Sequence, residues 1–326
     1  MPDLSRETLV NAVLLLLLPA AALTALALGE TFYINLVSRI AIVALAGVGL
    51  NLALGAGGLV SFGHAAFFGV GGYAAGIAAH HAFDMSLFLG LLPGTVWMPV
   101  IWMTALLSAA LLALGIGAIS LRTRGVYFIM ITLAFAQMTY YFAISLTPYG
   151  GEDGLPIYLR NQMPGMNTND PIQFFALVFG VLLLTLWAMS RVTGSRFGAA
   201  LDMARLNDVR LASSGISPFP VRLTAFVISA MVTALAGALF ADLNGFVGPS
   251  MLSWHRSGEI MVIVILGGVG RLFGPVAGAI LFILLEVLLG GWTDFWQFWL
   301  GLVLLGAVLF ARGGLLGLLA GRARHD

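Results

Sequence analysis

Two pairs of polar residues in this apolar sequence have the types found in catalytic or metal sites. Ser61 and His64 lie three residues apart and have the chemistry of a nucleophile and a base. The residue two positions before Ser61 is Leu59, so the G-x-S-x-G turn that exposes a catalytic serine is absent. His80 and His81 are adjacent, and adjacent helical residues point to different faces, which does not favour a shared metal. We therefore expect no catalytic residues and no metal site.

Glycine is concentrated in two clusters, at residues 55–76 and 267–278, which share the outline L-G-x-x-G followed by F-G. Neither contains the phosphate-loop pattern G-x-x-x-x-G-K-[ST], and the chain has no Lys, so it is not expected to hydrolyse ATP. Glycine lets membrane helices approach closely. Unwound glycine-rich backbone can also line a polar path. Both interpretations stay open from the sequence.

The composition indicates a membrane protein. The 326 residues are 60% hydrophobic and 9% charged, with a mean hydropathy of +1.02. A soluble domain has about 45–50% apolar and about 25% charged residues. The apolar stretches are continuous rather than alternating, which excludes a β-barrel. The net charge is +1 without a basic run, so nucleic-acid binding is not expected, and the absence of Cys excludes disulfides and thiol chemistry.

Ten apolar segments are long enough to suggest membrane spans of about 20 residues each. They run roughly over residues 9–28, 33–54, 62–81, 96–121, 125–147, 172–190, 220–242, 256–269, 274–290 and 294–311. The eighth is short and could be a broken or re-entrant piece that is buried in protein. The predicted fold is an all-α polytopic membrane domain that includes all of residues 1–326.

The distribution of arginine predicts the orientation. With the N-terminus in the cytoplasm, twelve of the 15 basic residues fall on the cytoplasmic side. The other three, Arg39, Arg160 and Arg256, fall outside or within a span near the external side. This positive-inside bias places both termini in the cytoplasm. The first segment resembles a signal peptide at Ala25–Ala27, but Asp3 and Glu7 remove the positive charge that such a leader needs. We expect a retained first helix.

Four ionisable residues are predicted near or within spans, where charge is costly and often functional. Arg39 and Asp242 lie near span ends and are expected to be structural. Glu259 lies at the start of the short eighth segment. The sequence supports equally a role in a transport pathway and a role in stabilising the N-terminus of the helix. Glu286 is nearest a span centre and has no evident partner in the sequence.

The longest cytoplasmic excursion runs from Arg191 to Pro220. Residues 197–211 contain no Pro and have helical spacing, which predicts one short amphipathic helix ended by Ser213-Ser214-Gly215. An external loop from Pro148 to Pro171 carries several charges. No separate soluble domain is predicted.

Five sequence blocks occur in an order that resembles the LivM-type permease subunits of branched-chain amino acid ABC importers. The resemblance covers roughly residues 35 to 310. The blocks are Asn51 with Ser61-Phe62-Gly63-His64-Ala65-Ala66-Phe67 and Gly71-Gly72-Tyr73; Arg124-Gly125-Val126-Tyr127-Phe128 with Thr132-Leu133-Ala134-Phe135; Gly150-Gly151-Glu152-Asp153-Gly154-Leu155; Phe226-Val227-Ile228-Ser229-Ala230 with Ala236-Gly237-Ala238-Leu239; and Ser257-Gly258-Glu259 with Leu266-Gly267-Gly268-Val269-Gly270 and Gly274-Pro275.

The resemblance implies that the cytoplasmic loop at about residues 191–219 carries a coupling helix, which docks on an ATPase subunit. The residues that match the family's loop pattern are Arg196, Arg205, Asn207, Asp208 and Gly215, whereas Arg210, Leu211 and Ser214 depart from it. The alternative is a helix that lies on anionic lipid headgroups. We also predict that the substrate path is lined by Ser61, Gly63, His64, Tyr73, Phe135 and Glu259.

The resemblance further implies a function and a set of partners. The function is import across the bacterial inner membrane of branched-chain amino acids, or of a related amino acid, amide, urea or aromatic acid. The implied partners are a second, LivH-like permease, two ATP-binding subunits (LivG-like and LivF-like), a periplasmic substrate-binding protein and membrane lipid. ATP and Mg would bind to the partners, with no cofactor on this chain. The alternative is a stand-alone ion-coupled secondary transporter, which would need paired intramembrane carboxylates that the spans rarely offer.

Overall fold

The computed structural model describes residues 6–88, 92–292, 295–310 and 313–320, and these are mostly helical. The helices are α1 (Arg6–Ala27), α2 (Thr31–Asn51), α3 (His64–Phe83), α4 (Met98–Ser120), α5 (Val126–Ser145), α6 (Pro171–Thr193), α7 (Arg196–Leu206), α8 (Asp208–Ser213), α9 (Pro218–Asn244), α10 (Trp254–Gly267), α11 (Gly274–Gly290), α12 (Trp296–Phe310) and α13 (Gly314–Ala320). The shorter elements are η1 (Leu52–Ala56, a π-helical turn), η2 (Thr147–Tyr149), η3 (Pro249–Leu252) and the paired strands β1 (Leu87–Phe88) with β2 (Leu92–Pro93) and β3 (Leu155–Pro156) with β4 (Phe246–Val247).

Each of the ten predicted apolar segments coincides with one of these helices, with ends that agree within three residues. This confirms the predicted all-α polytopic membrane fold. Among the described residues, six helices are long and apolar enough to cross a membrane by themselves, namely α1, α2 with η1, α4, α5, α6 and α9. Two shorter apolar helices lie at residues 274–290 and 297–306.

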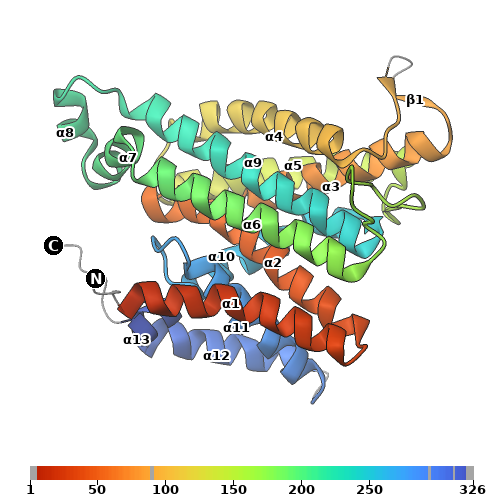
Figure 1. Ribbon diagram of the computed structural model, residues 1–326. Coiled ribbons are helices and arrows are strands. Elements are labelled where there is room, and N and C mark those ends of the chain that lie inside the picture. The colour runs from red at the N-terminus through yellow and green to blue at the C-terminus, as the bar shows by residue number, and fades with distance from the viewer. Residues whose placement is uncertain (1–5, 89–91, 293–294, 311–312, 321–326) are drawn as a thin grey trace.

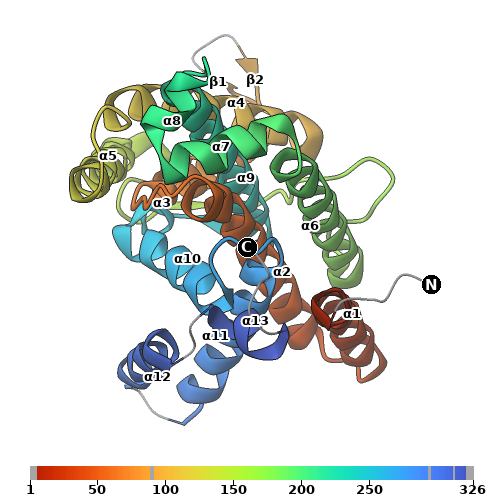
Figure 2. The ribbon, with the colours of Figure 1, turned by 90° about the vertical axis from the view of Figure 1, so that its left-hand side faces the viewer.

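Helix α2 forms the centre of the bundle. In its most apolar stretch 89% of the residues are buried, against 17% in α1. Helices α9, α11, α6 and α1 pack around it (Figure 1). Helices α7, α8 and α13 lie at one end together with the start of α1, as Figure 2 shows from that side. We call this end the α7 end, and we call the opposite end, where β1 lies, the strand end.

Helices α3 and α9 pack with their backbones in direct contact. A Cβ atom added at Gly71 would lie 1.8 Å from the carbonyl oxygen of Ala234, and one at Gly237 would lie 1.7 Å from that of Phe68. Only glycine fits at both positions, because any side chain would have to displace backbone. Small residues give membrane helices this close approach. Gly71, in the first glycine cluster, therefore serves the close packing of two helices.

Helix α10 is short and follows a break in the helical backbone. After β4, residues 248–253 run along α3 in an extended and 3₁₀ conformation, and α10 begins only at Trp254. Leu252 occupies the space beside Gly69, where an added Cβ would lie 2.3 Å from the leucine Cγ. Non-helical backbone at membrane depth is tolerated where protein covers it, and Leu252 is buried. The eighth predicted segment is therefore a short helix next to a break in the helical backbone, and whether it spans the membrane or re-enters stays a prediction.

Two charged residues that the sequence left without partners form an ion pair between α2 and α11. Arg39 donates hydrogen bonds of 2.8 and 2.9 Å from Nη2 to both carboxylate oxygens of Glu286. An unpaired charge at membrane depth is costly, and pairing offsets that cost. Asp242 of α9 is buried and accepts a hydrogen bond of 2.6 Å from Nδ2 of Asn161. This contact fixes the loop between α5 and α6 to the end of α9 and gives Asp242 a structural role.

Replacing Gly237 tests the backbone contact between α3 and α9. We expect Gly237→Ala to destabilise the protein by about 1–3 kcal/mol, because the new methyl group must displace the Phe68 carbonyl. The matched control is Gly115→Ala in α4, where no heavy atom lies within 4 Å of the added Cβ. The melting temperature of the detergent-purified chain measures both effects. Equal melting temperatures of the two variants would contradict the proposed packing.

Candidate functional site

A single asparagine joins the two glycine clusters. Asn51, at the end of α2, accepts a hydrogen bond of 3.0 Å at Oδ1 from the Gly270 amide. It donates one of 2.9 Å from Nδ2 to the carbonyl oxygen of Arg271. A Cβ atom at Gly55 would lie 2.6 Å from the Gly270 nitrogen, so the two backbones touch. The side-chain amide of Asn51 thus hydrogen-bonds both an N–H group and a carbonyl group of the facing loop. The two glycine clusters therefore meet at one junction.

The turn that leads into α3 is fixed by two buried serines. Ser257 of α10 accepts a hydrogen bond of 2.8 Å from the Ala65 amide and donates one of 2.7 Å to the carbonyl oxygen of Phe62. Ser61 accepts a hydrogen bond of 3.1 Å from the Gly63 amide. Backbone groups at a helix start that lack intrahelical partners are satisfied by such side chains. The start of α3 is therefore attached to the broken helix α10.

His64 belongs to a hydrogen-bonded chain in the helix core. Its Nε2 lies 2.7 Å from Oγ of Ser229, whose hydroxyl donates a hydrogen bond of 2.6 Å to the carbonyl oxygen of Gly49. A hydroxyl has one proton to donate, so Ser229 accepts a hydrogen bond from the protonated Nε2 of His64. The ring packs edge-on against Phe67 and Phe226 at 5.6 and 5.7 Å. This chain of hydrogen bonds connects α2, α3 and α9. Because the imidazole donates to Ser229 and does not accept from it, His64 is not placed to act as a base for Ser229.

The six residues predicted to line a substrate path differ in exposure. Four are buried and two retain accessible surface: Ser61, Gly63, His64 and Tyr73 are buried, whereas Phe135 is partly exposed and the Glu259 side chain is 43% exposed. Among the described residues no hydrogen bond joins Ser61 to His64, since each has a different partner. Of these six residues, Phe135 and Glu259 are therefore the two with surface accessible to a solute.

The start of α10 brings an acidic and a basic side chain together. Arg256 donates a hydrogen bond of 2.6 Å to Glu259, three residues later. Its guanidinium lies 5.0 Å from the ring centroid of Phe240 and 5.6 Å from that of Phe68. The N-terminus of a helix carries partial positive charge, and transporters build substrate sites from the ends of broken helices. This arrangement can bind a solute that has both charges.

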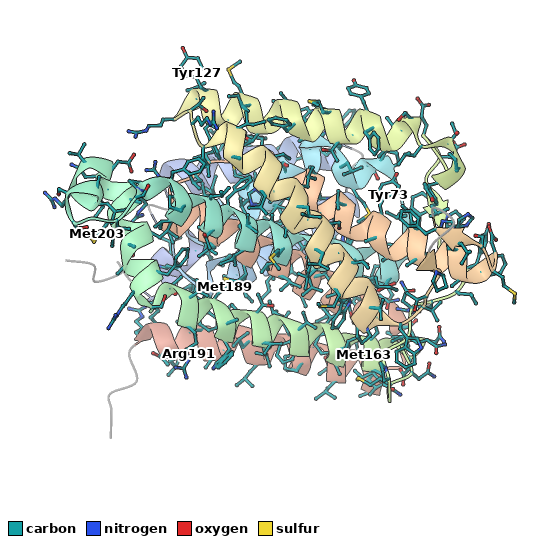
Figure 3. The ribbon with its side chains drawn as sticks, turned by 90° about the horizontal axis from the view of Figure 1, so that it is seen from above. Tyr73, Tyr127, Met163, Met189, Arg191 and Met203 are labelled. Atoms are coloured by element: carbon teal, nitrogen blue, oxygen red, sulfur yellow. The ribbon has the colours of Figure 1, made fainter. Side chains whose placement is uncertain are left out.

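Helix α5 has an exposed face beside α10. Tyr127, Met130, Met138 and Tyr141 recur at helical spacing, and each is largely exposed. Figure 3 shows Tyr127 at the outer edge of the bundle. Of the six spanning helices, α5 has the lowest mean hydropathy although most of it is exposed. Phenol and thioether groups suit a protein or solute surface better than a purely lipid one.

The loop between α6 and α9 contains two helices, where the sequence predicted one over residues 197–211. The chain is extended at Asn207 (φ −161°), and this break separates α7 from α8. Oδ1 of Asn207 accepts hydrogen bonds from the amides of Val209 and Arg210. Ser195 caps α7 in the same way. The single-helix prediction was wrong because Asn starts a helix more favourably than it continues one.

Asp208 fixes this pair of helices to the bundle. Its carboxylate lies 2.8 Å from Arg222 of α9 and 2.6 Å from Arg124 in the loop between α4 and α5. Arg222 also donates a hydrogen bond of 2.8 Å to the carbonyl oxygen of Ala204 in α7. Charge-assisted hydrogen bonds of this kind are the strong ones. Asp208 therefore orients α8 and does not face outward toward a partner.

The other residues matched to the coupling pattern divide into two groups. Arg205 donates a hydrogen bond of 3.2 Å to the carbonyl oxygen of Gly55, and its Cγ would lie 2.9 Å from a Cβ at Gly58. Its contacts thus connect α7 to the first glycine cluster. Arg196 is exposed, and Gly215 (φ +84°) is an exposed turn residue after α8. A contact of either group with an ATPase stays a prediction.

Several residues that hold these sites together were not predicted from the sequence. Ser229 and Ser257 lie inside the matching blocks, but their partners are 165 and 192 residues away. Leu206 and Val209 are 77% and 78% exposed on the loop helices. Their apolar character was visible in the sequence, whereas their exposure depends on the break between α7 and α8.

The fold defines an all-α, multi-pass membrane protein with a broken helix. Residues 32–312 match the family described as branched-chain amino acid transport system / permease component, and the chain belongs to this family. This confirms the resemblance to branched-chain amino acid permeases and the transport class.

Named relatives agree with this assignment. The chain is 27% identical over 294 residues to the high-affinity branched-chain amino acid transport system permease protein LivM of Escherichia coli K12, and 26% identical to that of Salmonella typhimurium. Each alignment covers 83% of this chain and 66% of the relative, so the chain spans just under two thirds of their length. The autoinducer 2 import system permease protein LsrC of Yersinia enterocolitica is 29% identical over 52% of this chain and 49% of its own length. No solved structure gives a significant match.

Neutralising Asp208 tests whether it holds the loop helices. We expect Asp208→Asn to destabilise the α7–α8 segment by about 3–5 kcal/mol, because the largely buried guanidinium group of Arg222 loses its carboxylate. Asp202→Asn is the matched control, since that exposed carboxylate lies 3.6 Å from Arg205 and such pairs contribute about 0–1 kcal/mol. Limited trypsin cleavage after Arg205 and Arg210 should accelerate in Asp208→Asn alone. Equal cleavage rates would contradict this role.

Proposed function

We propose that this chain is the non-catalytic permease subunit of an ATP-binding cassette importer. Membership of the permease family supports the transport role. The sequence has no Lys and hence no phosphate loop, so energy would come from ATP and Mg bound to two separate ATPase subunits. The observation that carries the proposal is the geometry of the α7–α8 loop, which combines an exposed apolar surface with firm attachment to the bundle.

The exposed surface of this loop suits a protein partner. Leu206 and Val209 lie on either side of the break and are exposed, with Arg196 and Arg210 exposed along the same segment. Apolar contacts surrounded by arginine are typical of protein interfaces. We propose that these residues dock in a groove of an ATPase subunit. In this arrangement Leu206 and Val209 would supply the apolar part of the partner contact, while Arg205, whose side chain is 45% exposed, also contacts Gly55 within the chain.

A continuous set of contacts would transmit movement from this loop to the broken span. Arg205 joins α7 to Gly55. Asn51, at the adjoining end of α2, joins the same glycine cluster to Gly270 in the loop after α10. Ser257 joins α10 to the start of α3. A displacement of α7 caused by ATP binding would thus reach both helices whose ends carry the proposed path residues.

We further propose that the substrate passes along the exposed faces of α5 and α10, against a homologous second permease subunit. Phe135 and Glu259 would line this path, and Glu259 with the start of α10 would accommodate the ammonium and carboxylate groups of an amino acid. The buried residues Ser61, Gly63 and His64 would support the path from behind, and Tyr73 would support it from within α3. A periplasmic binding protein would deliver the substrate at the strand end.

The arginine distribution supports the orientation. Arg196, Arg205 and Arg222 lie at the α7 end with the start of α1 and with α13. By the positive-inside rule this end faces the cytoplasm. We propose that both termini are cytoplasmic and that the protein resides in a bacterial inner membrane.

Uptake by a reconstituted complex tests the function. The chain, co-expressed with the permease, ATPase and binding-protein genes adjacent to its own, should accumulate labelled leucine, isoleucine or valine in proteoliposomes when ATP is enclosed with the ATPase subunits. A complex without ATP is the control. Uptake driven by an ion gradient without ATP would contradict the proposal and favour a secondary transporter. If leucine, isoleucine and valine all fail, amides, urea and aromatic acids are assayed in the same vesicles.

Docking is tested by placing charge on the exposed loop surface. We expect the double variant Leu206→Asp and Val209→Asp to lose the ATPase subunits during purification, because interface anchors typically contribute about 2 kcal/mol or more each. Leu159→Asp, at an exposed leucine between α5 and α6, is the matched control and should keep them. Retention of the ATPase by the double variant, with unchanged uptake, would exclude this surface as the docking site.

A further inference from the structure

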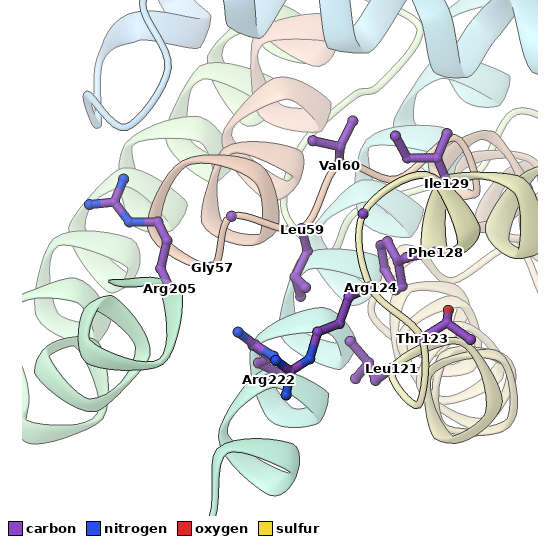
Figure 4. Close-up of a pocket in the computed structure, with 12 residues that line it drawn as sticks. Gly57, Leu59, Val60, Leu121, Thr123, Arg124, Phe128, Ile129, Arg205 and Arg222 are labelled. Atoms are coloured by element: carbon purple, nitrogen blue, oxygen red, sulfur yellow. The ribbon is translucent and has the colours of Figure 1, made fainter. Parts of the chain in front are cut away.

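A cavity of about 170 Å³ lies at the α7 end of the bundle. Its walls are the loop of residues 57–60, the residues Leu121, Thr123, Arg124 and Gly125 between α4 and α5, the first turn of α5, and the side chains of Arg205 and Arg222 (Figure 4). A water molecule occupies about 30 Å³ of liquid, so the cavity has room for a small polar group. Of its arginines, only Arg205 has a part in the transport steps proposed above, and none of those steps places a ligand in this cavity.

The cavity carries an excess of positive charge. Arg124 and Arg222 both line it, and Figure 4 shows their side chains converging below Leu59. Both guanidinium groups share the one carboxylate of Asp208, which balances only one of the two charges. The Arg222 side chain is 17% exposed, and its Nε has no hydrogen-bond partner among the described residues. The Arg124 side chain is 77% exposed and can reorient toward a ligand.

The N-terminus of α5 adds further hydrogen-bond donors on the same wall. Gly125, Phe128 and Ile129 line the cavity, and Gly125 is the N-cap residue of this 20-residue helix. With φ +60° and no side chain, Gly125 provides no cap for the amides of the first turn. Uncapped amides and the helix dipole favour an anion at such a position. Arg222 of α9, Arg124 of the α4–α5 loop and the N-terminus of α5 thus face one partly open pocket.

We propose that this cavity binds a phosphate group. Guanidinium groups bind phosphate oxygens through paired, charge-assisted hydrogen bonds, and the amides of α5 would complete the site. The group can come from free phosphate or from the headgroup of an anionic phospholipid. Beside the cavity, Ile119 and Val126 are exposed on α4 and α5, where acyl chains could lie. A bound phosphate would compete with Asp208 for the arginines and so influence the attachment of α8.

The free-phosphate source is tested by titration. The detergent-purified full-length chain is titrated with sodium phosphate at constant ionic strength, with chloride as the balancing anion, and the melting temperature is followed. We expect saturable stabilisation, with an apparent Kd about tenfold higher in Arg124→Gln, because one charge-assisted hydrogen-bonding group is lost. The matched control is Arg122→Gln, which removes the same charge from the same loop outside the cavity lining and should keep the wild-type Kd.

The lipid source is tested in nanodiscs. Native mass spectrometry of the chain in mixed phosphatidylglycerol and phosphatidylcholine should show retained phosphatidylglycerol, reduced in Arg124→Gln and unchanged in Arg122→Gln. An Arg124-dependent effect in either arm supports the site and identifies its source. If neither arm depends on Arg124, or if Arg122→Gln behaves like Arg124→Gln, the proposal is overturned. It is also overturned if Arg124→Gln only releases ATPase subunits, since the cavity would then be a protein contact.

Discussion

The direct backbone contact between α3 and α9 is the constraint on which the rest of the bundle depends. In a membrane the apolar side chains gain little by leaving lipid, so helices associate through close packing and hydrogen bonds. Gly71 and Gly237 allow the carbonyl groups of the facing helix to approach where a Cβ atom would otherwise lie. Once these two helices are in register, Ser229 of α9 reaches His64 of α3 and, through Gly49, also α2.

The same packing makes the broken span possible. Backbone that leaves helical geometry loses its internal hydrogen bonds and must be shielded from lipid. The segment before α10 is shielded because it runs in the glycine-lined face of α3, where Leu252 fills the space beside Gly69. Helix α10 can then start directly after this shielded segment, with Arg256 and Glu259 in its first turns. The break therefore lies beside the glycines of α3, where the absence of side chains leaves room for non-helical backbone.

Charge is placed in this molecule in pairs that connect distant elements. Arg39 and Glu286 join α2 to α11, and Asp208 joins the α7–α8 loop to α9 and to the loop after α4. At low dielectric an unpaired ion is costly, so each pair also selects one arrangement of its helices. The arrangement at Asp208 leaves one arginine charge unbalanced, and that excess faces the cavity at the α7 end.

The sequence by itself determined the class of protein and the extent of its spans, because twenty apolar residues in a row have one stable environment. It also indicated the family, through blocks that hold the packing glycines. Only the tertiary structure decided the partners: Glu286 meets Arg39 across 247 residues, and His64 meets Ser229 across 165. Helix periodicity is local, whereas these contacts depend on how helices cross. The hydrogen bond from Arg205 to Gly55 and the break at Asn207 were likewise decided by helix packing and by capping, which a spacing pattern does not encode.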